Sequence, residues 1–169
     1  MSYSDFDKHR SLVISLLFLA GVLVLTAMPM AAADQVPFKM TLNLMTTSIA
    51  PNPDACGTGS LVNIVGNGNA TELGRFTDTQ HHCIYPDSLV FDNGHFVFTA
   101  ANGDLLVGSY HGFLTPTGNP TVFDVHGQWV VTGGTGRFAN ATGSGVASGT
   151  LNAETGLVNL KLDGTISHP

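Results

Sequence analysis

The feature that most restricts the fold of this chain is the close spacing of its turns. From about residue 37 onward, short runs rich in Val, Phe, Thr and Leu are separated by Gly, Asn, Pro and Asp roughly every 8 to 15 residues. Connections this short cannot form the crossover that joins parallel strands, so neighbouring strands are expected to be antiparallel. The same region is poor in Lys, Glu and Arg, the residues that fill exposed helix faces, and we predict no amphipathic helix in it.

The turn residues divide this region into candidate strands and predict an all-β sandwich or barrel. Asn-Gly pairs at 92–95 and 101–104 suit two-residue hairpins, 115–120 and 153–156 suit longer turns, and 66–69 suits a turn or bulge. Glycines inside the strands favour the bends of a small closed barrel. The nine candidate strands are 37–45, 60–65, 71–80, 88–92, 95–100, 104–114, 121–131, 143–151 and 157–166.

The N-terminal segment is typical of a secretory signal peptide. Two basic residues precede an apolar run over 11–27, and Ala31 and Ala33 form an A-x-A cleavage pattern. We therefore predict a signal peptide over 1–33, an exported protein, and one domain over 34–169. The alternative is an uncleaved membrane anchor, although the apolar run of about 17 residues is slightly shorter than the ~20 that a bilayer core requires.

The charge of the remaining chain argues against a nucleic-acid partner. Four basic residues follow position 33, against ten acidic ones, so nothing is basic enough to follow a phosphate backbone. No second run is long and apolar enough to span a membrane. We expect membrane contact only through the N-terminal segment, if it is not cleaved.

The two cysteines, Cys56 and Cys83, predict one disulfide, because an even pair in an exported chain is typically oxidised. The chain-entropy model gives roughly 3.5 kcal/mol of stabilisation for closing such a loop. The alternative is a reactive thiol pair, which the absence of C-x-x-C spacing in the sequence disfavours. If the disulfide forms, we expect His82 to lie at the surface beside it.

The glycine-rich stretch 133–145, "GGTGRFANATGSG", predicts a structural corner between two strands. A nucleotide-binding P-loop would need a Lys after the glycines and a helix behind it, and neither follows here. Glycines supply positive backbone φ angles in a tight turn. The turn residues are expected to be Gly133, Gly134 and Gly136, with Arg137 bound to a carboxylate or carbonyls and Phe138 filling apolar space below.

Two motifs in this order resemble a known superfamily. The segment "VVTGGTGRFANATGSGVASGTL" (130–151) resembles the late-barrel signature of plant dirigent proteins and allene oxide cyclases. The segment "GNATELGRFTDTQ" (68–80) resembles an early signature of bacterial allene-oxide-cyclase-barrel-like proteins. The resemblance spans about Met40 to Ile166. It implies an eight-stranded antiparallel up-and-down (calycin-like) β-barrel with a central cavity, often assembled as a trimer.

The resemblance also implies a function that rests on shape and positioning. Dirigent proteins steer radical coupling without oxidising, and allene oxide cyclases hold a fatty-acid epoxide near a buried carboxylate and a bound water. Neither activity implies a cofactor. The cyclases carry a catalytic Glu on their early strand, whereas residues 38–48 of this chain contain no acid. A lipocalin-like carrier would need an early G-x-W, and Trp129 comes late.

Two hypotheses follow. The chain is a non-oxidising cyclase (an isomerase) or coupling guide for a small apolar ligand, or it is a binding or structural module without catalysis. An enzyme is expected to place at least one buried ionisable residue in the cavity, with a shifted pKa. The candidates are Asp78, Tyr110, Asp124 and His126.

Alternation along 121–131 separates Phe123 and Trp129 from Asp124 and His126, so only one of these pairs faces the interior. The apolar interior is the simpler arrangement, and an acid–base pair in the cavity is the alternative. Tyr110, Phe123 and Trp129 are the predicted ligand-binding residues. No His spacing predicts a metal site, and we expect none.

Overall fold

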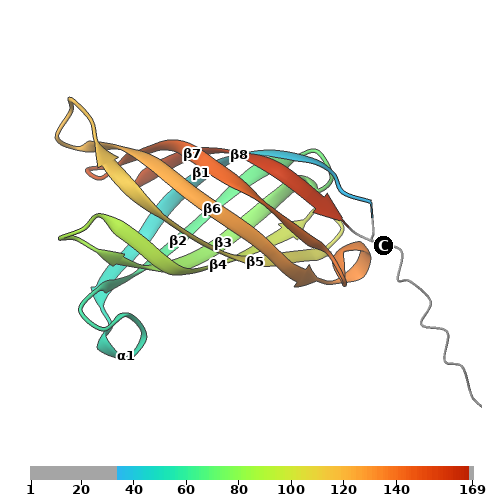
Figure 1. The fold of residues 1–169 in the computed structure, drawn as a ribbon, viewed down its shortest axis with the longest axis horizontal. Coiled ribbons are helices and arrows are strands. Elements are labelled where there is room, and N and C mark those ends of the chain that lie inside the picture. Colours follow the sequence, from blue (N-terminus) through green and yellow to red (C-terminus); the bar gives the residue numbers. More distant parts are fainter. Residues whose placement is uncertain (1–33, 168–169) are drawn as a thin grey trace, which may run out of the picture. The chain divides into compact units, whose positions relative to one another are not determined.

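The computed structural model describes residues 34–167 and forms a closed antiparallel barrel in which each strand pairs with the next and β8 pairs with β1. Figure 1 shows the strands wrapping at a steep tilt around one axis. The predicted signal peptide over 1–33 lies outside the described residues. No helix within 34–167 has the length and apolar character that crossing a membrane requires. The strands are β1 (Val36–Pro51), β2 (Ser60–Ala70), β3 (Gly74–Tyr85), β4 (Val90–Ala100), β5 (Leu105–Pro116), β6 (Val122–Gly134), β7 (Thr142–Asn152) and β8 (Leu157–Ser167).

The eight-stranded up-and-down barrel confirms the fold that the resemblance implied, and it decides against a sandwich. The turns at 101–104, 115–120 and 153–156 lie where the sequence predicted them. The predicted strand at 71–80 begins later, at Gly74, because Thr71 to Leu73 form the β2–β3 turn.

The predicted hairpin at 92–95 is wrong, because β4 runs through it as one strand. The pairing of β4 with β5 shifts register between Phe91 and Gly94, and Asn93 takes a φ of 51°. This is a β-bulge, which uses the same tolerance of Asn for positive φ that a hairpin turn uses. A Cβ on Gly94 would contact the Tyr110 ring at 2.8 Å, so the glycine at the bulge makes room for that ring.

The predicted turn or bulge at 66–69 is also wrong, because these residues lie inside β2. Gly66 and Gly68 face the interior, where a Cβ would contact the side chains of Leu44 and Phe76 at 2.7 and 2.5 Å. The glycines therefore mark positions where large side chains of neighbouring strands fill the barrel.

The glycine-rich stretch forms the predicted corner between β6 and β7. It contains the short 3-10 turn η1 (Gly136–Phe138), and Gly136 takes a φ of 56°. Arg137 Nε lies 4.0 Å from Asp104 Oδ2, and the fully buried Phe138 packs below. Gly134 does not have a positive φ; it is glycine because a Cβ there would meet the carbonyl oxygen of Leu105.

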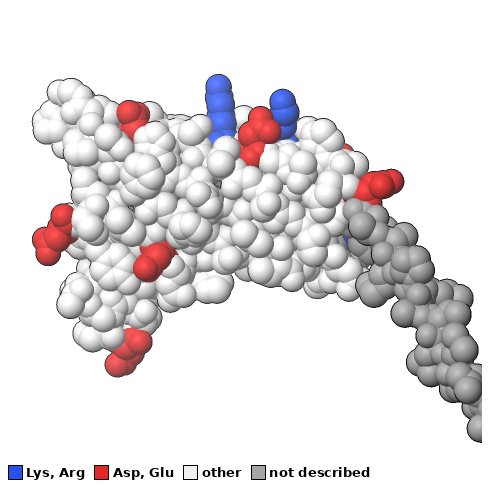
Figure 2. All heavy atoms as spheres, in the orientation of Figure 1, with Lys and Arg blue, Asp and Glu red and all other residues white. Residues whose placement is uncertain are grey.

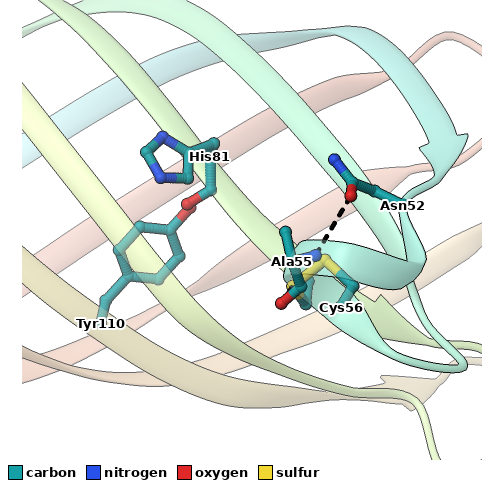
Figure 3. Close-up of a disulfide and its surroundings, with 6 residues drawn as sticks. Asn52, Ala55, Cys56, His81 and Tyr110 are labelled. Carbon is teal, nitrogen blue, oxygen red and sulfur yellow. Dashed lines mark hydrogen bonds between the residues drawn. A yellow bond between two sulfur atoms is a disulfide. The ribbon is translucent and has the colours of Figure 1, made fainter.

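The disulfide between Cys56 and Cys83 confirms the predicted pairing and fastens the β1–β2 connection to β3, with Cα atoms 5.4 Å apart. Cys56 ends the short helix α1 (Pro53–Cys56), whose start is capped by the Asn52 side chain accepting from the Ala55 amide at 3.1 Å (Figure 3). Both sulfurs are buried beneath this connection. The disulfide is consistent with an exported protein.

Candidate functional site

One end of the barrel is filled by side chains. At this end lie the β2–β3, β4–β5 and β6–β7 turns, because the strands alternate in direction. Aromatic rings pack against each other within it, with the Phe76 and Phe98 rings tilted and their centroids 4.7 Å apart. The residues that close this end are buried almost completely: Phe38, Leu73, Phe76, Phe98, Leu106, Phe138, Ala141 and Ile166.

The other half of the barrel holds a cavity of about 340 Å³, lined mainly by apolar side chains. The β7–β8 turn, from Ala153 to Gly156, contributes to its lining, whereas no turn of the filled end does. The cavity is therefore a blind pocket that opens at the end carrying α1. Its volume lies within the usual range for small-molecule sites, roughly 300–1,000 Å³.

Trp129 and Tyr110 both line this cavity, as the sequence predicted for ligand-binding positions. Trp129 is 2% exposed, and its indole N–H donates to the Val146 carbonyl at 3.2 Å, so the ring presents apolar surface to the interior. The large ring fits because β7 and β8 carry glycine beside it. Cβ atoms on Gly145 and Gly164 would contact the ring at 2.5 and 2.6 Å.

A polar cluster interrupts the apolar interior along the inner face of β3, formed by Asp78, Gln80 and His82 together with Tyr110 of β5. Period-two alternation places the three β3 side chains on one face. Gln80 and His82 line the cavity. Asp78 lies one step deeper, toward the filled end, where the Gln80 amide donates to its Oδ2.

Asp78 is the most unusual member of the cluster. It is 1% exposed, and its Oδ1 has no hydrogen-bond partner among the described residues. Burial raises the pKa of its carboxyl from 3.8 to about 7, and the hydrogen bond from Gln80 opposes this only in part. The carboxyl therefore exchanges a proton near neutral pH.

His82 and Tyr110 form a second polar contact beside the cavity. Their Nδ1 and hydroxyl oxygen lie 2.8 Å apart, and the Tyr110 hydroxyl also lies 3.4 Å from the His81 carbonyl oxygen (Figure 3). Burial lowers the pKa of His82 to about 4, with a smaller contribution from His81. Burial and the Asp78 carboxyl raise the pKa of Tyr110. Both side chains are therefore uncharged at neutral pH.

The predicted candidates do not all meet in the cavity. Asp124 and His126 lie exposed on the outer face of β6, so the alternative that placed them inside as an acid–base pair is wrong. The reason is alternation: Val125 and Trp129 take the interior positions of that strand. Phe123 is half-buried near the start of β6 and is not among the cavity-lining residues.

Gln80 and His82 line the cavity although the sequence did not predict them there. His82 was predicted at the surface beside the disulfide, but it lies inside, and Cys83 lies on the opposite face of the same strand, against α1. The sequence did indicate their position, because alternation along the strand places Asp78, Gln80 and His82 on the same face as the buried Phe76. Within residues 34–167, no group of three His, Cys, Asp or Glu side chains is arranged to hold a metal ion.

Comparison with known proteins finds likeness at the level of the fold. Neither the protein-family models nor the curated proteins gave a match. The structure is similar to that of the pterocarpan synthase dirigent protein GePTS1, with a TM-score of 0.56 and 14% identity, covering 87% of this chain and 98% of that one. It is also similar to the pterocarpan synthase dirigent protein PsPTS1, with a TM-score of 0.51 and 15% identity, covering 82% and 96%. The described chain therefore has the eight-stranded barrel fold of the dirigent proteins.

Proposed function

We propose that this protein is an exported barrel that holds a small, largely apolar molecule in its cavity and steers a cofactor-independent reaction of it, as a dirigent-like coupling guide or a cyclase. The observation that carries the proposal is the Asp78 carboxyl, which is buried behind Gln80, one step below the lining of a mainly apolar cavity. The two structural neighbours are pterocarpan synthase dirigent proteins, and we extend only this class of guided reaction to the present chain.

The cavity supplies the positioning part of this function. A rigid barrel wall with aromatic side chains holds an apolar molecule in a restricted set of orientations, which lowers the entropy that a ring closure or coupling must lose. The rigidity has a structural basis: the closed sheet has no free edge, and the disulfide fixes the connection beside the cavity mouth.

The polar cluster supplies the proton-transfer part. A carboxyl whose pKa lies near 7 can both release and accept a proton at neutral pH, which is the condition for efficient general acid–base catalysis. Tyr110 and His82 line the cavity and would contact the ligand, and Asp78 reaches it through Gln80. We assign Tyr110 and His82 to contact with the ligand and Asp78 to the exchange of the proton.

A second candidate function is binding without turnover. It is favoured by the position of Asp78, which lies behind Gln80 and outside the cavity lining. The two functions differ in what the Asp78 carboxyl does. A guide or cyclase needs its proton exchange, whereas a binder needs only the cavity.

The first test is native mass spectrometry of the secreted protein, purified without detergent. The expected result is a chain that lacks residues 1–33, keeps one disulfide and carries a small apolar molecule. The same spectrum would show whether the chain assembles as the trimer that the resemblance implies. An empty protein that also excludes apolar fluorescent dyes would overturn the proposed ligand cavity.

The second test separates the two functions once a ligand is known. Asp78→Asn keeps the shape of the side chain and an oxygen for Gln80, but it cannot exchange the proton. With the variant saturated with ligand, conversion reduced at least a hundredfold would support the guide or cyclase. No conversion by either protein, with the ligand returned unchanged, would leave the binder.

A further inference from the structure

The mouth of the cavity is surrounded by acidic residues. The connections that end at the open end of the barrel, and the strand ends beside them, bring five carboxylates to this region. Figure 2 shows acidic side chains gathered at the α1 end, while the basic side chains in view lie away from it. The five residues are Asp54, Asp87, Asp92, Asp124 and Glu154.

None of the four basic residues that the structure describes lies at the mouth. Lys39 and Arg75 lie near the filled-end starts of β1 and β3, Arg137 lies in η1, and Lys161 lies near the middle of β8. Lys39 forms an ion pair with Asp163, and Arg137 with Asp104, both away from the mouth. A mouth lined by one sign of charge raises the local concentration of ligands of the opposite sign.

The cavity itself contains no positive charge within the described residues. Neither Lys nor Arg lines it, and His82 is neutral at physiological pH. Asp78 lies buried directly behind the lining residue Gln80, and its Oδ1 has no partner among the described residues. An anionic ligand would therefore enter without a counter-charge, and an unpaired buried charge is strongly disfavoured. A cationic ligand would instead compensate the buried carboxyl.

Aromatic side chains make the walls suitable for a cation. The face of an aromatic ring attracts an ammonium group, and Trp and Tyr do so most strongly. Five Phe, Tyr and Trp side chains line the cavity: Phe91, Phe96, Phe98, Tyr110 and Trp129. The Trp129 N–H and the Tyr110 hydroxyl already have partners, so these residues offer mainly their rings.

From the acidic mouth, the buried unpaired carboxyl and the aromatic walls, we propose that this barrel takes an apolar molecule that carries a positively charged nitrogen. The inference rests on the proposed ligand-holding function and specifies its ligand class. It predicts that the cavity does not bind apolar carboxylates, even those that resemble the cationic ligand in shape.

The test uses three probes that share one ring system and differ in charge: 1-naphthylmethylamine, 1-naphthalenemethanol and 1-naphthoate. Their binding to the purified protein at pH 7.5 is followed by isothermal titration calorimetry, with Trp129 fluorescence as a second readout. The amine is expected to bind at least tenfold more tightly than the alcohol, and the carboxylate most weakly. The difference should shrink as salt is added, because the mouth carboxylates are exposed to screening.

Substitutions test which carboxylates cause the preference for the amine. The double substitution Asp87→Asn and Asp124→Asn, at two mouth residues outside the cavity lining, should weaken amine binding about three- to tenfold and leave alcohol binding unchanged. Asp78→Asn should weaken amine binding at least tenfold. The matched control is Asp163→Asn, which also removes one carboxylate but lies away from the mouth beside Lys39. The control should change the affinity for none of the probes.

The outcomes separate this inference from the function on which it rests. If the alcohol binds as tightly as the amine, or the carboxylate binds best, the charge preference is wrong while the ligand cavity stands. If none of the three probes binds up to millimolar concentration, the proposed cavity function is itself overturned, and the charge preference with it.

Discussion

At the scale of the residue, Asp78 determines most of the chemistry that this barrel can offer. It occupies a position that alternation assigns to the interior of β3, where Phe76 and His82 also lie. Opposite it, β2 presents Gly66 and β4 presents Phe98. These neighbours remove water from the carboxyl without supplying a cation, which is why its pKa rises.

The raised pKa of Asp78 makes folding stability depend on pH. Between about pH 4 and pH 7 the folded carboxyl keeps a proton that the unfolded chain has lost, so the contribution of Asp78 to stability falls as pH rises. The lowered pKa of His82 contributes in the opposite direction between about pH 4 and 6.5. Each pH unit is worth about 1.4 kcal/mol, which gives on the order of 4 kcal/mol in total. Asp78→Asn should remove this decline. Urea unfolding at pH 4.5, 6 and 8 would measure it, and parallel pH profiles for both proteins would contradict the assignment.

Tyr110→Phe should lower the free energy of unfolding, because it removes the hydrogen-bond partner of His82. The substitution keeps the ring but removes the hydroxyl that lies 2.8 Å from His82 Nδ1. A buried polar atom left without a partner costs about 1–3 kcal/mol, and we expect a loss of unfolding free energy in that range. Denaturant unfolding at pH 7 would measure it. A loss below 0.5 kcal/mol, with an unchanged slope against denaturant, would show that the contact contributes little.

At the scale of the element, the corner around η1 closes the filled end of the barrel. Its backbone depends on Gly136, which combines a φ of 56° with close contact to the Asp104 carboxylate. Leu105 donates its amide to the Thr135 hydroxyl at 2.9 Å, so the corner and the β4–β5 turn hold each other in place. The glycine-rich motif is therefore a packing device of the fold.

Gly136→Ala should destabilise the protein by roughly 2–4 kcal/mol, because the Cβ adds both a strained φ and a clash with Asp104. Gly103→Ala is the matched control. Gly103 also has a positive φ, of 88°, but a Cβ there meets nothing within 4 Å. Its cost should be about 1 kcal/mol, from backbone strain alone. Equal losses in thermal unfolding of the two variants would mean that the Asp104 contact is unimportant.

Removal of the disulfide should loosen the β1–β2 connection and lower the stability of the whole barrel. The double substitution Cys56→Ser and Cys83→Ser should cost roughly 3.5 kcal/mol, from the greater entropy of the unfolded chain. Hydrogen exchange should accelerate most at α1 and the neighbouring ends of β2 and β3. Uniform acceleration across all eight strands would argue against a local role.

At the scale of the whole molecule, the barrel divides into a filled half that carries stability and a hollow half that carries the cavity. Phe38, Phe76 and Phe138 are deeply buried at the filled end, and the lining of the cavity comes from all eight strands. Binding and folding should therefore be separable by substitution.

Ala147→Leu should fill the cavity without unfolding the barrel, since Ala147 lines the hollow half of β7. We expect the affinity for apolar probes to fall at least tenfold, because the added side chain takes the space of the ligand. Ser148→Leu is the control, since the next residue on β7 faces outward and is exposed. Its probe affinity should not change. Strong binding to the Ala147→Leu variant would show that the probes bind elsewhere.

The sequence alone determined the strand content, the antiparallel order, the disulfide and the glycine corner, because each depends on local patterns. Alternation and turn residues act over a few positions, and a pair of cysteines in an exported chain has one partner choice. Two turn predictions, at 66–69 and 92–95, were wrong because Gly and Asn-Gly occur both in turns and in strands that are bulged or crowded by neighbouring side chains.

Only the tertiary structure decided which faces enclose the cavity and which residues meet there. His82 and Tyr110 are 28 positions apart, and their contact depends on the stagger of three neighbouring strands around the barrel. The raised pKa of Asp78 likewise could not be predicted from its own segment, because a carboxyl's pKa depends on what surrounds it in space. Closure of the sheet supplies those surroundings, and with them the buried carboxyl that lies behind Gln80.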